Sequence, residues 1–315
     1  MRRQFKPLLT RPEDFEVFWE STWRQLQHTD TAIDRQAVEG GDDPLIGLET
    51  VSFESLGHVR VSAHCLSWRD NQPRPLVISS HGYGCRCEPR YDWARQGLNV
   101  LCVDIRGFGL SEGAISKPSQ WGYVLTGIDT PETSAIRLAA CDYMQAVVVA
   151  QQLFAGRTSS LVFEGVSFAG GLALMAQAVT GMADLLAIGV PTFGWAEGRN
   201  LFVKSGSGAE ISNYVAHRPD RAEDTMVVLR YFDTVNFADS VSCPTLLALG
   251  LEDDVVPAKT VYGIANHLKV PFELMEFPVS HSDGPEDAQW EQFSRRWIDL
   301  ACNGIPADFG RPAAS

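Results

Sequence analysis

The sequence has 315 residues, of which 45% are hydrophobic and 21% are charged, and these values exclude an intrinsically disordered chain. The formal net charge of −13 excludes an extended phosphate-binding surface, so we expect no nucleic-acid partner and no attraction to anionic membranes. No apolar stretch reaches the roughly 18 residues of a membrane-spanning helix, and no apolar run follows the basic N-terminus as a secretory signal requires.

The seven cysteines indicate a cytoplasmic protein. An odd number of thiols, scattered through expected strands, a helix and loops, is typical of free cysteines in a reducing compartment. Cys85 and Cys87 form a closely spaced pair, but no second Cys/His pair follows at the spacing of a zinc site. We therefore expect no bound metal.

The first elements expected along the chain are a helix and a hairpin. Residues 12–28 carry hydrophobic side chains at three- and four-residue spacing, which predicts an amphipathic helix. Residues 48–55 and 59–66 alternate between apolar and polar side chains and are separated by a short turn sequence, which predicts an antiparallel hairpin. Residues 12–66 are therefore expected to form an N-terminal extension.

After Pro75 the pattern changes to short apolar runs that alternate with helical stretches. Nearly continuous apolar strands are typical of a parallel sheet with helices on both faces, and helices are expected at 133–154 and 170–180. No repeat and no low-complexity linker divides the chain. We predict an α/β protein with one doubly wound, mostly parallel sheet in a single domain over residues 1–315, preceded by the antiparallel N-terminal extension.

The segment 192–241 is too long for a simple connection between two strands. We expect it to hold two or three helices over the carboxyl edge of the sheet, where proteins of this class bind ligands. A lid or pocket wall is the preferred interpretation, and simple packing is the alternative.

The sequence Gly165-Val166-Ser167-Phe168-Ala169 follows an apolar strand and precedes a helix of small residues. This context is typical of the nucleophile elbow of α/β hydrolases, where small residues two positions from the serine relieve a strained turn. Ala169 replaces the usual second glycine and adds only one methyl group. The context favours a nucleophile over an ordinary turn serine, and it favours the α/β-hydrolase fold.

A serine nucleophile needs a base and an acid that orients the base. In α/β hydrolases the acid and then the histidine follow the serine along the chain, each in a loop after a strand. His281 follows an expected strand at 272–277 and is the histidine that matches this context. Glu252, Asp253 and Asp254 follow the preceding strand and compete for the role of the acid.

The oxyanion of a tetrahedral intermediate needs hydrogen-bond donors. The backbone N–H of Phe168 follows the nucleophile at the start of a helix, where the helix dipole favours negative charge. The second donor is expected to be the N–H of Tyr83, after Gly82, which permits close approach; an ordinary strand-end turn is the alternative. His81 is expected to hydrogen-bond to neighbouring loops and not to act as a base.

Four aromatic residues lie near the expected mouth of the site: Trp121, Tyr123, Phe193 and Trp195. Their side chains could shape an acyl or alcohol pocket. They could equally belong to the core, and the sequence favours neither interpretation.

The chain resembles carbohydrate esterase family 7, the acetyl xylan esterases and cephalosporin C deacetylases. The likeness extends from residue 12 to residue 297 and is carried by the segments PEDFEVFWESTW, HGYGCR, DIRGFGLSEG, WGYVLTGI, GVSFAGGLAL, RYFDTVNFA and GLEDDVVPAKTVYGIANHL. The resemblance implies a catalytic triad of Ser167, Asp253 and His281, with oxyanion N–H groups from Tyr83 and Phe168.

The same resemblance implies an activity and an assembly. The family removes small acyl groups, chiefly acetyl, from sugar and antibiotic hydroxyls, so the expected partner is a small-molecule ester substrate. It uses no metal and no organic cofactor. Its members are often ring-shaped hexamers, so a homo-oligomer is expected here.

Three short signatures of that family are altered in this chain. Phe108 stands in place of Gln, Phe168-Ala169 in place of Gln-Gly, and Ser282 in place of the Glu after the histidine. The paired loss of glutamine suggests one remodelled contact, in which Phe108 and Phe168 pack together. The altered surroundings leave a related ester, thioester or lactone hydrolase as the alternative activity. A hydrolase-fold binding protein without catalysis is the other alternative, and the intact triad argues against it.

Overall fold

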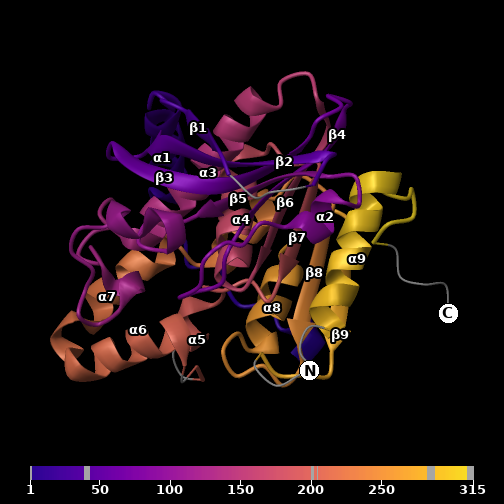
Figure 1. Cartoon of the computed structure of the whole chain (residues 1–315). Helices are drawn as coiled ribbons and strands as arrows, with labels where there is room; N and C mark the ends of the chain where they lie inside the picture. The colour runs from indigo at the N-terminus through magenta and orange to yellow at the C-terminus, as the bar shows by residue number, and fades with distance from the viewer. Residues whose placement is uncertain (1, 39–42, 200–201, 204, 282–287, 311–315) are drawn as a thin grey trace.

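The computed structural model describes residues 2–38, 43–199, 202–203, 205–281 and 288–310, and these contain one nine-stranded sheet (Figure 1). The strand order is β1-β2-β3-β5-β4-β6-β7-β8-β9. The strands are β1 (Asp34–Ala37), β2 (Ile46–Ser55), β3 (Val59–Trp68), β4 (Arg74–Ser80), β5 (Asn99–Asp104), β6 (Thr158–Val166), β7 (Leu185–Gly189), β8 (Thr245–Gly250) and β9 (Phe272–Phe277). The pairs among β1, β2, β3 and β5 are antiparallel, and all pairs from β5 to β9 are parallel. The predicted α/β-hydrolase arrangement, a mostly parallel sheet with an antiparallel N-terminal extension, is confirmed.

Helices cover both faces of this sheet because strand side chains alternate between the faces. The helices are α1 (Phe15–Gln27), α2 (Tyr91–Ala94), α3 (Ala135–Leu153), α4 (Phe168–Thr180), α5 (Ala196–Arg199), α6 (Gly206–His217), α7 (Ala222–Arg230), α8 (Ala258–Ala265) and α9 (Ala288–Asn303). One core layer joins α1, α3, α4 and α8 to strand residues such as Ile78 and Phe163. The other joins α2 and α9 to residues such as Val77 and Val162.

The N-terminal extension agrees with the sequence in its helix and hairpin but contains one further strand. Helix α1 is amphipathic and buries Phe15, Phe18, Trp19 and Leu26. The hairpin of β2 and β3 pairs from Ile46↔Trp68 to Ser55↔Val59. The edge strand β1 was not predicted, because its four residues are polar or small, all exposed, and show no apolar alternation.

A buried ion pair joins the extension to the parallel part of the sheet. The Arg106 guanidinium donates to both oxygens of Asp142 in α3, at 2.9 and 2.6 Å, and both side chains are at most 4% exposed. Ser55 at the end of β2 donates to the same carboxylate at 2.5 Å. Removing one partner of such a pair typically costs about 3–5 kcal/mol, since a charge stays buried without compensation.

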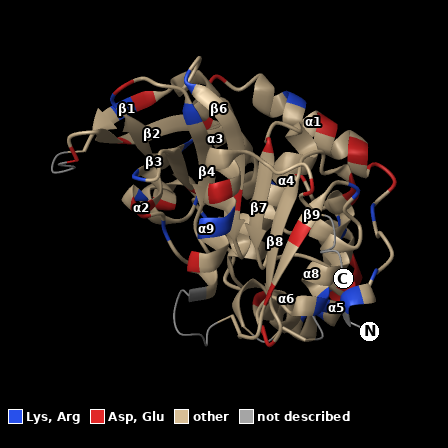
Figure 2. Ribbon diagram, turned by 90° about the vertical axis from the view of Figure 1, so that its right-hand side faces the viewer, with Lys and Arg blue, Asp and Glu red and all other residues tan. Residues whose placement is uncertain are grey.

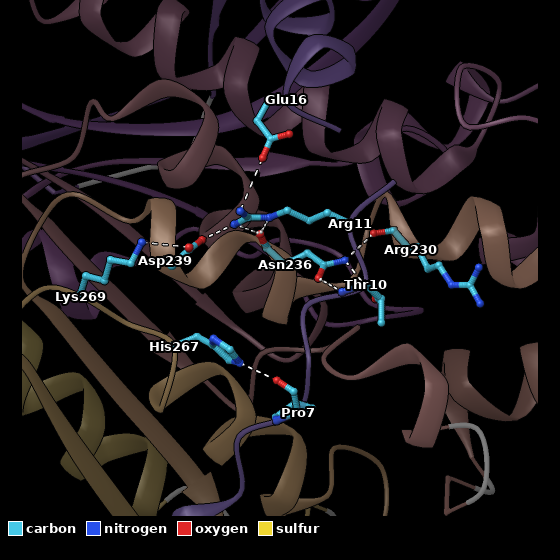
Figure 3. A network of polar contacts seen from close by, with 9 residues as sticks. All are labelled: Pro7, Thr10, Arg11, Glu16, Arg230, Asn236, Asp239, His267 and Lys269. Atoms are coloured by element: carbon cyan, nitrogen blue, oxygen red, sulfur yellow. Dashed lines mark hydrogen bonds and ion pairs between the residues drawn. The ribbon is translucent and has the colours of Figure 1, made fainter. Parts of the chain in front are cut away.

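The segment before α1 is held by polar contacts to residues far along the chain (Figure 3). The backbone N–H of Thr10 donates to Asn236 at 2.9 Å, and Arg11 donates to the Asn236 carbonyl and pairs with Asp239. His267 lies just past the end of α8 and bonds through Nε2 to the Pro7 carbonyl at 2.8 Å. Residues 7–11 are therefore fixed against the segments that follow α7 and α8.

The segment 192–241 contains the short helices α5, α6 and α7 and lies beyond the carboxyl ends of β7 and β8 (Figure 1). Within the described residues this agrees with the predicted two or three helices. A 3-10 helix, η5 (Thr234–Ser240), returns the chain to the sheet and packs on α4.

Charged residues of both signs are distributed over the molecule. Figure 2 shows Lys and Arg interspersed with Asp and Glu along the helices and loops.

None of the helices in the described part of the chain combines the length and the apolar character that crossing a membrane requires. All seven cysteines are described and are free thiols.

Candidate active site

Ser167 lies in a strained turn between β6 and α4. Its φ of 59° and ψ of −114° lie outside the conformations that residues with a side chain usually adopt. Two backbone bonds hold the turn: the Ser167 N–H donates to the Gly189 carbonyl at 2.8 Å, and the Thr192 N–H donates to the Ser167 carbonyl at 3.1 Å. A Cβ at Gly165 would lie 2.4 Å from the carbonyl carbon of Ala169, so the turn requires glycine at position 165. Strain of this kind is typical of a nucleophile elbow.

His281 and Asp253 are hydrogen-bonded to each other in the loops after β9 and β8. His281 Nδ1 lies 2.7 Å from Asp253 Oδ2, and the Asp253 side chain is 0% exposed whereas that of His281 is 21% exposed. The N–H groups of Val255 and Val256 donate to Asp253 Oδ1 at 2.8 and 2.7 Å. An ionised carboxylate only accepts, so Nδ1 carries the proton and Nε2 is left with its lone pair.

The hydrogen bond to His281 distinguishes Asp253 from the two acidic residues beside it in the sequence. Glu252 and Asp254 are exposed, and only Asp253 among the three bonds to His281 in the described structure. The two loops are also joined by backbone bonds, from Leu251 N–H to Phe277 at 2.8 Å and from Glu252 N–H to Val279 at 3.2 Å. The acid and the histidine are therefore placed by the same pair of adjacent strands.

Ser167 and His281 line one cleft of about 620 Å³ at the carboxyl edge of the sheet. Tyr83 and Phe168 line it as well. Its other polar lining residues include Ser79, Ser80, Glu164, Thr192, Ser205 and Ser207, from β4, β6 and the 192–241 segment, and Arg86, Glu88 and Arg90, from the loop after β4. The presence of Ser205 and Ser207 means that the N-terminal end of α6 forms part of the cleft wall.

The two residues expected to supply oxyanion donors, Tyr83 and Phe168, both line the cleft. Phe168 is the first residue of α4, and the first N–H groups of a helix have no partner within the helix. Tyr83 lies in the loop after β4, beside His81. The His81 ring accepts from the Ile105 N–H at 3.1 Å and bonds to the Gly82 carbonyl at 2.8 Å, and burial lowers its pKa. His81 therefore connects the loop after β4 to the residue that follows β5, and its hydrogen bonds to neighbouring loops agree with the sequence expectation.

Aromatic rings surround Phe168. Its ring, which is fully buried, lies at 5.5 Å from Tyr83, 6.2 Å from Tyr123, 6.0 Å from Phe193 and 6.2 Å from Phe108, measured between centroids. The predicted contact between Phe108 and Phe168 is therefore present, with the rings in an edge-to-face arrangement. Ser282, the third altered signature position, lies outside the described residues.

The four aromatic residues expected near the mouth do not form the cleft. Among the described residues, the lining of the cleft includes none of them. Tyr123 and Phe193 pack behind Phe168, Trp121 packs on Tyr214 at 5.7 Å, and Trp195 packs on Phe5 at 4.7 Å. Phe193 is buried, and Trp121, Tyr123 and Trp195 are half-buried residues packed against the core.

Glu164 is a cleft residue that the sequence interpretation missed. It lines the cleft three positions before Ser167, is 3% exposed, and accepts a hydrogen bond from Ser79 at 2.5 Å. Burial raises its pKa to about 7, against the opposing effects of Ser79 and Arg90. The available signal was a carboxylate inside the otherwise apolar strand sequence LVFEGV.

The described residues contain no group of three or more His, Cys, Asp or Glu side chains placed to hold a metal ion. The arrangement that the structure offers is a serine, a histidine and a carboxylate, with backbone N–H groups nearby. These are the components of acyl transfer through a covalent intermediate.

Comparisons with known proteins include a match to one family model over most of the chain. The profile of the acetyl xylan esterase family matches residues 2–297. An acetyl esterase from Xylanibacter ruminicola is 21% identical over 291 residues, which are 87% of this chain, and the chain spans 64% of the length of that relative. The solved acetyl xylan esterase from Paenibacillus sp. R4 has a TM-score of 0.86 at 23% identity, covering 95% of this chain and 98% of that one. Acetyl xylan esterase 1 from Thermoanaerobacterium sp. JW/SL YS485 has a TM-score of 0.85 at 19% identity, covering 94% and 96%. At these identities the solved structures establish the shared fold.

Proposed function

The chain belongs to the acetyl xylan esterase family, and from that premise we propose that it is a serine esterase that removes small acyl groups, chiefly acetyl, from hydroxyl groups of a small-molecule ester. The observation that carries this proposal is the 2.7 Å bond between His281 and the buried Asp253, beside the strained Ser167 in one cleft. Acetylated sugars and acetylated antibiotics are the proposed substrates.

In the proposed first half-reaction, Ser167 Oγ attacks the ester carbonyl carbon while His281 Nε2 takes the hydroxyl proton. The carbonyl π electrons move to the oxygen, and the N–H groups of Tyr83 and Phe168 stabilise that oxyanion. Asp253 stabilises the imidazolium as it forms. The intermediate collapses, the carbon–alkoxy bond breaks, and His281 returns the proton to the leaving alcohol.

The second half-reaction repeats these roles with water. His281 takes a proton from water, which attacks the acyl-enzyme, and the oxyanion is stabilised by the same two N–H groups. Collapse of the second intermediate breaks the bond to Ser167 Oγ, which regains its proton from His281. The acid product leaves, and no redox step or cofactor is needed for the balance.

Ser167→Ala tests the proposal. We expect kcat for p-nitrophenyl acetate to fall on the order of 10⁶-fold with an unchanged circular dichroism spectrum, since the attacking atom is lost. Ser205→Ala is the matched control, because Ser205 also lines the cleft but is not part of the triad, and it should retain activity. A Ser167→Ala variant that keeps full activity, or a native chain that a fluorophosphonate probe does not label, would disprove the proposal.

The leaving and acyl groups are tested by a chain-length series. A sharp fall in kcat/KM from acetyl to butyryl p-nitrophenyl esters would support a small acyl pocket, and acetylated sugars and cephalosporins would then define the alcohol. Faster hydrolysis of thioesters or lactones than of acetyl esters would instead favour the alternative activity.

We also propose that the protein works as a homo-oligomer, a hexamer on the family resemblance, in a reducing compartment such as the cytoplasm. The seven free thiols support the compartment. Light scattering coupled to size-exclusion chromatography would measure the assembly.

A further inference from the structure

A carboxylate on the helix that forms the cleft wall contacts the loop that carries a proposed oxyanion donor. Glu210 lies on α6, one turn after Ser207, which lines the cleft. Its Oε2 accepts a hydrogen bond from the Tyr83 hydroxyl at 2.7 Å, across 127 residues of sequence. We propose that Glu210 is a positioning residue for the oxyanion loop: it holds the Tyr83 side chain so that the Tyr83 backbone N–H stays directed at the reacting carbonyl. This inference rests on the function proposed above.

The oxyanion loop needs such a contact because its backbone is intrinsically permissive. Tyr83 is flanked by Gly82 and Gly84, and Gly84 adopts a φ of +74°. Glycine on both sides widens the range of conformations open to the Tyr83 peptide unit. The Gly82 carbonyl is held by the His81 ring at 2.8 Å and by the Cys85 N–H at 3.0 Å. The Tyr83 side chain adds a second restraint to the same tripeptide, on the other side of the Tyr83 peptide unit.

Two kinds of contact fix that side chain. The ring packs edge-to-face on Phe168 at 5.5 Å and on Phe108 at 6.0 Å, which restrains its position but leaves some freedom to slide. The hydroxyl is bonded to the Glu210 carboxylate, which adds direction and a fixed distance. Hydrogen bonds to a charged acceptor are roughly twice as strong as those between neutral groups.

The position of Glu210 is itself well determined. Burial raises the pKa of Glu210, and the hydrogen bond from Tyr83 and the nearby Val124 backbone N–H oppose that increase. The carboxylate lies against the backbone at Gly122, where a Cβ would be 2.0 Å from it. Glu210 thus joins three segments, namely helix α6, the turn at 122–125 and the oxyanion loop.

The expected kinetic signature follows from the role of the donor. An oxyanion donor acts mainly on the transition state, so a displaced donor lowers kcat and leaves KM nearly unchanged. Loss of such a donor costs about 10²–10³-fold in kcat, and a displaced donor should cost less. We expect Glu210→Ala to lower kcat for p-nitrophenyl acetate roughly 10-fold.

The experiment compares Glu210→Ala, Glu210→Gln, Tyr83→Phe and the double variant Tyr83→Phe/Glu210→Ala in the full chain. Glu210→Gln keeps an acceptor oxygen of the same shape, so it should recover most of the lost kcat. Tyr83→Phe removes the other end of the same bond, so it should resemble Glu210→Ala, and the double variant should be no slower than either single one. Glu197→Gln is the matched control, since Glu197 is a carboxylate on the neighbouring helix α5 that bonds to Arg230 at 2.8 Å.

The outcomes separate this inference from the proposed function. A native enzyme that is labelled at Ser167 and active, with unchanged kcat in Glu210→Ala or with additive losses in the double variant, would overturn the positioning role alone. A lower melting temperature with unchanged kcat would show that Glu210 only stabilises α6, which also overturns it. If Glu210→Ala does not fold, Glu210→Gln and Tyr83→Phe still decide, because only the second should lose kcat substantially. Absence of Ser167 labelling in the native chain would remove both proposals together.

Discussion

The acid–base side of the candidate site and its oxyanion side differ in the interactions that fix their geometry. On the acid–base side, Asp253 receives two backbone N–H groups and bonds to His281, so its two oxygens are held by directional bonds of 2.7–2.8 Å. On the oxyanion side, Phe168 is enclosed by the rings of four Phe and Tyr residues and of His81, at centroid distances of 5.5–6.2 Å. One side is a short chain of hydrogen bonds, and the other is a packed aromatic cluster to which Glu210 adds a polar contact.

This difference indicates how each side should respond to substitution. A hydrogen bond depends on the identity of single atoms, so an isosteric change can remove it without changing the packing. Ring packing is less directional and depends on volume. A substitution among the rings is therefore expected to change the free energy of unfolding more than it changes the position of the oxyanion N–H groups. The following predictions separate the two responses.

The largest effect is expected from Asp253→Asn. The amide would donate to His281 Nδ1 and place the ring proton on Nε2, which could then no longer accept the proton of Ser167. We expect kcat to fall on the order of 10⁴-fold while the melting temperature changes little. Asp254→Asn, which changes the exposed neighbour, should leave kcat unchanged; equal losses in both variants would contradict the assignment of Asp253.

An intermediate effect is expected from Phe108→Gln and Phe168→Gln. Each single change places an amide among aromatic rings, and we expect it to lower the free energy of unfolding by roughly 2–4 kcal/mol, measured by urea denaturation. The double variant lets the two amides bond to each other, so its loss should be smaller than the sum of the single losses. Additive losses would show that the two positions are not one coupled contact.

The smallest effect is expected from Glu164→Gln, and it depends on pH. The pKa of Glu164 is raised to about 7 in the folded chain from its ordinary value of 4.5, mainly by burial. Between these values the folded state binds more protons than the unfolded state, so the native protein loses stability from this group as the pH rises from about 4.5 to 7. The glutamine variant should therefore gain stability relative to the native protein over that window, as shown by urea denaturation at several pH values. A constant difference between the two proteins would contradict the raised pKa.

Local sequence was sufficient to predict those elements whose conformation depends on neighbouring residues in the chain. The elbow at Ser167 was recognisable because a strained turn restricts its neighbours to small residues, and the structure has a φ of 59° there. The alternating hairpin and the buried parallel strands were also recognisable, since side-chain periodicity follows from backbone geometry. The polar edge strand β1 carried no such pattern and was missed.

Local sequence did not determine which side chains from distant segments contact one another. The sequence left three carboxylates as candidates for the acid, and the pairing of β8 with β9 places Asp253 in contact with His281. It left open whether Trp121, Tyr123, Phe193 and Trp195 belong to a pocket or to the core, and in the described structure none of the four lines the cleft.

The sequence by itself therefore determined the class of fold, the candidate nucleophile and the order of the candidate residues that support it, because turns and periodicity are local properties. The tertiary structure alone decided which carboxylate faces the histidine, which rings enclose Phe168, and that Glu210 reaches Tyr83 across 127 residues. Those contacts depend on strand order and on how the 192–241 segment folds back over the sheet, and neither is recorded in the spacing of residues along the chain.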